Sequence, residues 1–354
     1  MISEKLKYIF GQFEHGAEFD SYKELASGHI NDTYLIKAKE KPHFVLQRIN
    51  HGVFKDVPGL IENKMLISNH IKDKLGHLSP KKQKRRILRF YMTKSGDSYY
   101  RGDEGNYWNL MHFIDKSVTH LSVTSETIAH EGGRLLGQFL TLTNDFDASK
   151  LTEVIPKFHD MSFRYWEFEE AKRKASQERL EKAKAQIELV GNAKEEMHIL
   201  QHLKESGDIK LRVTHNDTKI SNVLFNKRDK GLCLIDLDTV MPGIVHYDFG
   251  DAIRTICNTA AEDEANLDLV EFNVDYYNAY TKGFLKEMGD SLTPIELKYL
   301  PLGAKTMIFI IGLRFLTDYL NGDIYFKTKY DDHNLDRAKN QFKLLQSLSE
   351  KLSV

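Results

Sequence analysis

The sequence has 354 residues, with 50 basic and 51 acidic side chains and a formal net charge of −1. A chain of this length can bury the cores of two lobes. Its near-neutral charge gives no general attraction to nucleic acid or to an anionic membrane, so we expect neither as a partner.

Cysteine usage and the N-terminus bear on the cellular compartment. The two cysteines, Cys233 and Cys257, lie among apolar residues and indicate no disulfide framework, which favours a reducing compartment. Residues 1–14 mix polar and apolar side chains and do not read as a signal peptide. No stretch is expected to reach the length of a membrane span. The prediction is a cytoplasmic protein.

The N-terminal part of the chain is predicted to be a small sheet with helices. Apolar residues at helical spacing predict a helix over 2–13, and another helix is expected to begin near Pro58 and to include Glu62. In that helix a solvated Glu62 is the simpler interpretation. Strand-like segments lie near 18–26, 32–39, 43–49, 86–94, 98–101 and 107–115.

Two short stretches in this part carry polar residues of interest. The turn at 27–32 contains Gly28, which permits close backbone approach, although one glycine also fits a plain hairpin turn. The strand FVLQRIN (44–50) places Gln47 beside Arg48. Because side chains alternate across a strand, only one of these two can face inward.

The basic run KKQKRR (81–86) does not favour a nucleic-acid site. Its aromatic neighbours, Phe90 and Tyr91, follow the charges and do not alternate with them. In a chain of near-zero net charge we interpret this run as a solvated connector.

From Ser125 the pattern becomes helical, with an apolar stripe that predicts a core helix. One or two long charged helices are expected within 161–206. Further helices are expected near 247–258, 267–288, 293–320 and 333–352. The predicted fold class is therefore α+β and bilobal, with an antiparallel N-terminal lobe at 1–114 and a mostly helical C-terminal lobe at 115–354.

Residues 213–251 contain the pattern that carries chemistry. His215, Asp217 and Asn222 form His-x-Asp-x-x-x-x-Asn, which is similar to the catalytic loop of protein kinases. A buried-type strand then ends at Asp236, with Asp238 close behind. Carboxylate oxygens suit Mg²⁺. Such residues also cap turns, but the order of strand, loop, strand, turn, strand and acid favours phosphoryl transfer.

Long strings in the chain resemble one family. These strings resemble the aminoglycoside and choline kinase-like phosphotransferases, and within them the N-acetylhexosamine 1-kinases. They are SGHINDTY (27–34), FVLQRIN (44–50), YWNLMHFID (107–115), HNDTKISNVLF (215–225), LIDLDTVMPG (234–243), YDFGDAIRT (247–255) and LRFLTDYLNGDIYFK (313–327).

The resemblance implies a protein kinase-like fold and a reaction that uses ATP and Mg²⁺. It implies that Asp217 orients the acceptor hydroxyl and takes its proton, and that Lys219 balances charge on the phosphoryl group. Asn222 and Asp236 are the expected metal ligands. His215 is expected to be structural.

On the nucleotide side, the resemblance implies that the Gly28 turn covers the nucleotide and that Met111 to Phe113 form a hinge against the adenine. Many relatives have a phosphate-pairing lysine on the third strand. Here Gln47 or Arg48 takes that neighbourhood, and the sequence leaves open which of the two faces the phosphates.

On the acceptor side, the resemblance assigns Arg314 and Tyr325 to the sugar. Asp251 and Arg254 are expected to line the same pocket, and His29 and Asp32 to reach it. Asp248 is expected to brace the catalytic loop. A salt bridge from Arg314 to Asp318 or Asp251 is the structural alternative.

The predicted function is phosphorylation of the anomeric hydroxyl of an N-acetylhexosamine. A rival keeps the reaction but acts on an aminoglycoside, choline or another small alcohol, and a third reading is a catalytically silent nucleotide-binding protein. The sequence leaves open the gluco or galacto configuration, ATP or GTP, and the oligomeric state.

Overall fold

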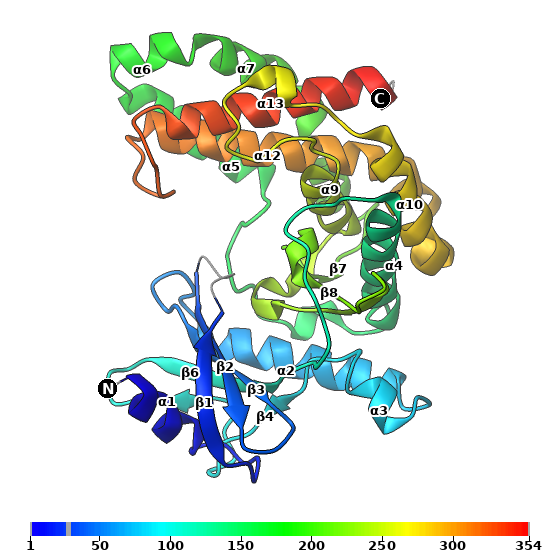
Figure 1. The fold of residues 1–354 in the computed structure, drawn as a ribbon. Coiled ribbons are helices and arrows are strands. Elements are labelled where there is room, and N and C mark those ends of the chain that lie inside the picture. The colour runs from blue at the N-terminus through cyan, green and yellow to red at the C-terminus, as the bar shows by residue number, and fades with distance from the viewer. Residues whose placement is uncertain (1, 26–29, 353–354) are drawn as a thin grey trace.

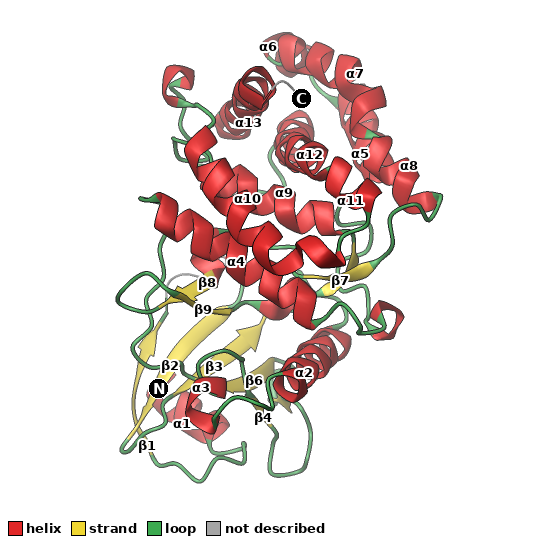
Figure 2. Ribbon diagram, turned by 90° about the vertical axis from the view of Figure 1, so that its right-hand side faces the viewer, coloured by secondary structure: helices red, strands yellow, loops and turns green. Residues whose placement is uncertain are grey.

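The computed structural model describes residues 2–25 and 30–352 and has two lobes (Figure 1). Strands are concentrated in the N-terminal lobe, and helices make up most of the other lobe (Figure 2). The predicted α+β, kinase-like bilobal fold is confirmed. Gly28 and His29 lie outside the described residues.

The N-terminal lobe is built on a six-stranded antiparallel sheet in the order β1-β2-β3-β6-β4, with β5 also paired to β6. The strands are β1 (Phe19–Glu24), β2 (Asp32–Ala38), β3 (Phe44–Ile49), β4 (Phe90–Tyr91), β5 (Tyr100–Arg101) and β6 (Tyr107–His112). Alternation on β3 gives the sheet its two faces. Phe44 and Leu46 pack with α1 (Ile2–Phe10), while Ile49 packs with α2 (Val57–Lys74).

Helix α2 begins at an Asp56 cap, whose side chain accepts from the Gly59 amide, with Pro58 in the first turn. Beyond it, α3 (Pro80–Gln83) lies in the basic run, where Lys81 and Lys82 are exposed. The predicted strand at 86–94 is shorter in the structure, where only β4 is formed, and Ile87 and Leu88 are buried in the main hydrophobic core.

Two long helices in the C-terminal lobe approach each other closely. Helix α4 (Glu126–Leu142) starts at Ser125, whose hydroxyl accepts from the Ile128 amide. It packs against α10 (Val274–Met288). A Cβ at Gly133 would lie 2.1 Å from the Tyr280 carbonyl oxygen, so only a glycine allows this contact.

The charged region at 161–206 is divided into four helices, where one or two were expected: α5 (Met161–Lys174), α6 (Gln177–Lys182), α7 (Lys184–Met197) and α8 (Ile199–Glu205). The remaining helices are α9 (Val245–Ile256), α11 (Pro294–Lys298), α12 (Leu300–Leu320) and α13 (His333–Leu352). The expectation that no stretch reaches the length of a membrane span was wrong. Helix α12 is long and apolar enough, but it is mostly buried among α5, α9 and α13.

Four short strands complete the C-terminal lobe and frame the site. Strand β7 (Arg212–Thr214) pairs with β10 (Met241–Gly243), and β8 (Val223–Phe225) pairs with β9 (Gly231–Leu234). Both cysteines are buried and free, and burial raises the pKa of the Cys233 thiol to about 12.

The lobes are joined by buried polar contacts as well as by the chain. Asn63 of α2 donates to the carbonyl oxygens of Thr152 and Val240 at 2.8 and 2.9 Å, and it accepts from the Thr152 amide at 2.9 Å. The boundary at residue 114 stays a prediction.

Candidate active site

The loop at 215–222 connects β7 to β8 and is held from behind by helix α9. Asp248 accepts from the amides of His215 and Asn216, each at 2.7 Å. Burial outweighs these two donors and raises the pKa of Asp248 to about 7. Asp251, one turn further along α9, accepts from the Thr218 amide at 2.9 Å. Two carboxylates thus fix the backbone on both sides of Asp217, and for Asp248 this is the bracing role expected.

Asp217 is in contact with two of the residues singled out in the sequence. Its Oδ2 accepts from Lys219 Nζ at 2.9 Å and from Asn222 Nδ2 at 2.8 Å. Burial would lower the pKa of Lys219, but Asp217 and then Asp236 outweigh it and raise that pKa. Lys219 therefore remains charged beside the carboxylate.

His215 is fully buried and its Nε2 donates to the Ile235 carbonyl oxygen at 2.9 Å. Burial lowers its pKa, which favours the neutral ring. The side chain joins the loop to the strand end at 235–236. It is placed as a structural residue, in agreement with the expectation for it.

Asp236 follows β9 in a left-handed conformation, with φ 63°. Non-glycine residues adopt this conformation uncommonly, although Asp does so more readily than most types, and such residues recur at functional sites. Burial, then the carboxylates of Asp238 and Asp217, raise the pKa of Asp236 to about 7. The Ile235 amide donates to the Asn222 carbonyl oxygen at 2.9 Å, which brings Asn222 alongside.

This arrangement fits a divalent cation. The carboxylates of Asp238 and Asp217 both raise the pKa of Asp236, and a cation would relieve that repulsion. Asn222 uses its amide nitrogen on Asp217, so its oxygen is directed elsewhere. Across 2–25 and 30–352, no three His, Cys, Asp or Glu side chains form a ready metal cluster. A set of one amide and one or two carboxylates matches Mg²⁺, which usually takes other ligands from phosphates and water.

The N-terminal lobe contributes Gln47, and not Arg48, to the inner face. Gln47 is 8% exposed and accepts from Lys64 Nζ of α2 at 3.2 Å. Lys64 also forms an ion pair with Asp238. Arg48 lies on the opposite face of β3, where it pairs with Asp32 and donates to Asn106. The proposed role of Arg48 on the phosphates is therefore corrected.

Lys64, Asp238 and Asn31 were not assigned from the sequence. Asn31 Nδ2 donates to Asp238, and its side-chain oxygen accepts from the Asn50 amide at 2.8 Å. These contacts join the turn before β2 to the strand end at 236–238. A lysine in a mixed charged helix carries no local signal that it points inward. Glu62, by contrast, is exposed, which agrees with the simpler interpretation of it as a solvated helical residue.

The expected hinge residues lie at the end of β6. Met111 is mostly buried and pairs in the sheet with Val45 and Phe90. The Phe113 amide donates to the His43 carbonyl oxygen at 2.9 Å. That amide is therefore engaged in this structure, and adenine recognition by Met111 and Phe113 stays a prediction.

Asp251 and Arg254 belong to a chain of charges behind the loop. Arg254 donates to Asp251 at 3.1 Å and to Glu262 at 2.7 Å. Glu262 also accepts from Arg337 of α13 at 2.8 Å. Both predicted acceptor residues thus have protein partners, and their contact with a substrate stays a prediction.

Arg314 of α12 has aromatic neighbours and not the carboxylate partner that the structural alternative required. Its Cζ lies 5.4, 5.8 and 5.5 Å from the ring centres of Phe158, Tyr325 and Phe326. It forms no ion pair within the described part of the chain. Burial, then the charge of Arg164, lower its pKa to about 10. Asp251 pairs with Arg254, so it is not the partner of Arg314.

Asp318, the other possible partner of Arg314, accepts from the backbone amides of residues 324–326. It therefore holds the segment that carries Tyr325, which is 67% exposed. The structural alternative for Arg314 is not formed. Phe158 was not assigned from the sequence because it lies far from Arg314 along the chain.

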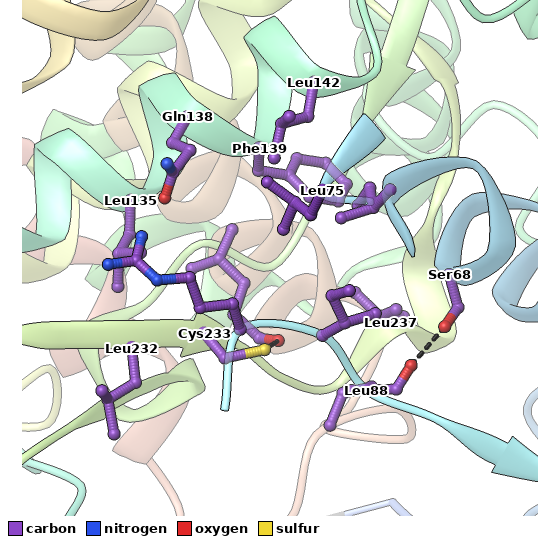
Figure 3. Close-up of a pocket in the computed structure, with 14 residues that line it drawn as sticks. Ser68, Leu75, Leu88, Leu135, Gln138, Phe139, Leu142, Leu232, Cys233 and Leu237 are labelled. Atoms are coloured by element: carbon purple, nitrogen blue, oxygen red, sulfur yellow. Dashed lines mark hydrogen bonds between the residues drawn. The ribbon is translucent and has the colours of Figure 1, made fainter. Parts of the chain in front are cut away.

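Two hollows lie close to the loop but are not lined by Asp217 or Asp236. One, of about 40 Å³, has mainly apolar walls from α2, α4 and β9, with Ser68 donating to the Leu88 carbonyl oxygen at its edge (Figure 3). It has room for only a water or two. The other, of about 240 Å³, lies beside Asn216 and is mostly polar.

Comparisons with known proteins identify the family of this chain and solved structures that share its fold. The model of a family described as the phosphotransferase enzyme family matches residues 21–281. A microcompartment-associated aminopropanol kinase superposes with a TM-score of 0.66 at 14% identity, covering 99% of this chain and 97% of its own.

Two further solved structures have the same fold. An aminoglycoside phosphotransferase from Alicyclobacillus acidocaldarius gives a TM-score of 0.65 at 12% identity, covering 98% of this chain and 96% of its own. An amicoumacin kinase, solved with AMP-PNP, Ca²⁺ and Ami, gives 0.62 at 13% identity, covering 98% of this chain and 93% of its own.

Proposed function

Because the chain belongs to the phosphotransferase enzyme family, we propose that it transfers the terminal phosphoryl group of ATP to the anomeric hydroxyl of an N-acetylhexosamine. Membership and fold make it a small-molecule phosphotransferase, and membership of a kinase family implies ATP use. The observation that carries the reaction is the contact of Asp217 with both Lys219 and Asn222, beside Asp236 in its left-handed conformation.

In the proposed reaction the sugar hydroxyl oxygen forms a bond to the γ-phosphorus. The bond from that phosphorus to the β–γ bridging oxygen breaks, which leaves ADP. Asp217 takes the proton of the hydroxyl, and a group in this role typically contributes about 10²–10⁴-fold. An anomeric hydroxyl is more acidic than an ordinary alcohol, so a carboxylate base is a suitable match.

Lys219 and a metal ion at Asn222 and Asp236 would together neutralise the negative charge of the transferring phosphoryl group. Lys219 forms an ion pair with Asp217 at 2.9 Å, which would keep it at the same reacting centre. Asn222 and Asp236 would hold Mg²⁺, which when bound supplies positive charge to the phosphate oxygens. Phosphoryl transfer depends mainly on such positioning and charge stabilisation.

The acceptor is inferred from the surroundings of Arg314. A guanidinium framed by aromatic rings, and with no ion pair to any residue that the structure describes, offers donors to sugar oxygens, while the rings suit the faces of a pyranose. Arg164 and Arg254 lie near enough to lower the pKa of Arg314, and each is itself paired with a carboxylate, Glu167 and Asp251 respectively. A cationic acceptor such as choline would want free acids or an aromatic cage that a guanidinium does not already occupy. The Arg314 surroundings therefore favour a neutral N-acetyl sugar.

The test is ATP consumption by the purified protein with GlcNAc, GalNAc, glucosamine, choline, aminopropanol and kanamycin. We expect turnover with an N-acetylhexosamine and loss of its reducing end, because the product carries phosphate on the anomeric oxygen. Glucosamine, which replaces the neutral acetyl group by a cation, should be poor. Turnover with choline or kanamycin and none with either N-acetyl sugar would remove this acceptor.

Asp217→Asn is the control for the site. It keeps the size of the side chain but removes the base, so kcat should fall about 10²–10⁴-fold while ADP binding is retained. Undiminished turnover in this variant would place the chemistry elsewhere.

A further inference from the structure

One lysine of α2 is buried between the lobes. Lys64 is 1% exposed, forms an ion pair with Asp238, and donates to Gln47 Oε1 at 3.2 Å. A buried ammonium is costly unless it is paired, and a pair of buried charges is seldom more stable than an apolar pair of the same size. Stability alone therefore does not account for a lysine at this position.

The position reverses the usual arrangement of a kinase site. In protein kinases a lysine on the third strand contacts phosphate and is held by a glutamate of the following helix. Here the third strand presents the neutral Gln47, and the following helix presents the cation. Glu62, the acid nearest to Lys64 on that helix, is exposed to solvent.

The surroundings of Lys64 belong to the proposed nucleotide site. An ammonium has three donors. Among the described residues, Lys64 donates to Gln47 and forms an ion pair with Asp238. Asp238 is two residues from Asp236, and Lys64 is among the charges that favour the ionised form of Asp236. Asn31, in the turn before β2, also binds Asp238. A phosphate that reaches Asp236 would meet Lys64 next to the strand end.

We propose that Lys64 is the phosphate-binding cation of this enzyme. It lies on α2 and takes the role that a lysine on the third strand has in protein kinases. Asp238 holds the ammonium in place through an ion pair, and Gln47 accepts a hydrogen bond from it. Bound phosphate takes the third donor. The inference rests on the proposed nucleotide site.

The first test is Lys64→Met, assayed for turnover and for ADP binding by calorimetry. We expect ADP affinity and kcat/KM for ATP to fall about 10–100-fold, the usual effect of losing a hydrogen bond between charged groups. Lys64→Arg should retain most of the affinity. Lys72→Met, on the same helix but exposed, is the matched control and should leave both quantities unchanged. A folded Lys64→Met with unchanged ADP affinity would overturn the inference.

The second test moves the cation. Because Lys64→Met leaves Asp238 unpaired and can lose the fold, Gln47→Lys is combined with it, so that a strand lysine replaces the helix lysine. If Lys64→Met folds, the double variant should bind ADP at least about tenfold more tightly than Lys64→Met does. If Lys64→Met does not fold, the ADP affinity of the double variant should be within about tenfold of that of the natural protein. A folded double variant that binds ADP no better would overturn the inference, and so would one that fails to fold.

The two levels of proposal remain distinguishable. A natural protein that binds no ADP and consumes no ATP removes the proposed function itself. If the natural protein does both, Asp217→Asn is inactive and the Lys64 variants are unaffected, then only the proposed role of Lys64 is rejected.

Discussion

At the scale of single residues, Arg314 has the features of a binding group. It is a cation in an aromatic frame, without an ion pair in the described chain, and with a lowered pKa. Replacing it by Met should raise the acceptor KM about 10–100-fold, because donors to the sugar are lost. The free energy of unfolding should stay level or rise by about 1–2 kcal/mol, since the variant removes a partly buried charge that has no ion pair among the described residues. Steady-state kinetics at saturating ATP and chemical denaturation measure both.

Arg337 supplies the matched control for that prediction. It lies 3.8 Å from the ring centre of Phe315 and is paired with Glu262. Arg337→Met should lower stability and leave acceptor KM nearly unchanged. The reverse pattern, with Arg314→Met unstable and its acceptor KM unaltered, would give Arg314 a structural role.

Asp248 should make stability depend on pH in a direction unusual for an acid. Its pKa is 3.8 in an exposed carboxyl and about 7 here, so between these values the folded chain binds a proton that the unfolded chain has released. Its contribution is therefore greatest below about pH 4 and declines until about pH 7, by at most ~4 kcal/mol. Asp248→Asn should lose less stability than the natural protein between pH 5 and 8, measured by denaturation without nucleotide.

Asp145 is the control for this slope. Hydrogen bonding from Lys74 lowers its pKa, so its contribution is lost only as the pH falls below the usual carboxyl range. Asp145→Asn should leave the slope from pH 5 to 8 unchanged. Equal slopes in the natural protein and Asp248→Asn would show that Asp248 does not carry the effect.

At the scale of elements, the contact between α4 and α10 depends on Gly133. A methyl group there would lie 2.1 Å from a backbone oxygen of Tyr280, so the helices would have to separate. Gly133→Ala should cost about 3 kcal/mol or more, at the upper end of overpacking effects. Gly191→Ala in α7, where nothing lies within 4 Å, should be neutral or stabilising by about 0.5–1 kcal/mol. Thermal or chemical denaturation of the two variants gives the comparison.

Most elements were predictable because their signals are local. Ser125 begins α4 and Pro58 stands at the start of α2, as their types suggest. The division of 161–206 was not predictable, since no glycine or proline marks the breaks. At Ser176 the chain becomes extended, and its hydroxyl accepts from the Arg179 amide, a cap that looks like any other polar position in a charged stretch.

In the candidate site, too, only the contacts within one short segment could be predicted from the sequence. Asp217, Lys219 and Asn222 share one loop, so their spacing alone predicted their meeting. Lys64 and Asp238 meet only after the two lobes have come together, and nothing near either residue in the sequence indicates the other. Contacts between distant segments are set by packing, which the order of residues does not display.

At the scale of the whole molecule, Asn63 holds the lobes together. It makes three hydrogen bonds to Thr152 and Val240 and is 1% exposed. Asn63→Ala should cost about 2–4 kcal/mol, because buried backbone groups lose their partners. Hydrogen exchange should quicken at the Thr152 amide, which loses its acceptor.

Ser68 offers a comparison on the same helix. Its hydroxyl makes one bond, to the Leu88 carbonyl oxygen. Ser68→Ala should cost less and leave exchange at Thr152 slow. If Asn63→Ala left that exchange slow as well, the contact would not contribute to holding the lobes.

The burial of both cysteine thiols is useful for experiments on the movement of the two lobes. Both cysteines are buried, and burial raises the pKa of each, so neither is available as a thiolate to an alkylating reagent. Dyes directed at two cysteines introduced on the surface, one on each lobe, would therefore label those positions without replacement of the native pair. Energy transfer between such dyes would report whether the halves of the enzyme swing as ATP is taken up and ADP is released.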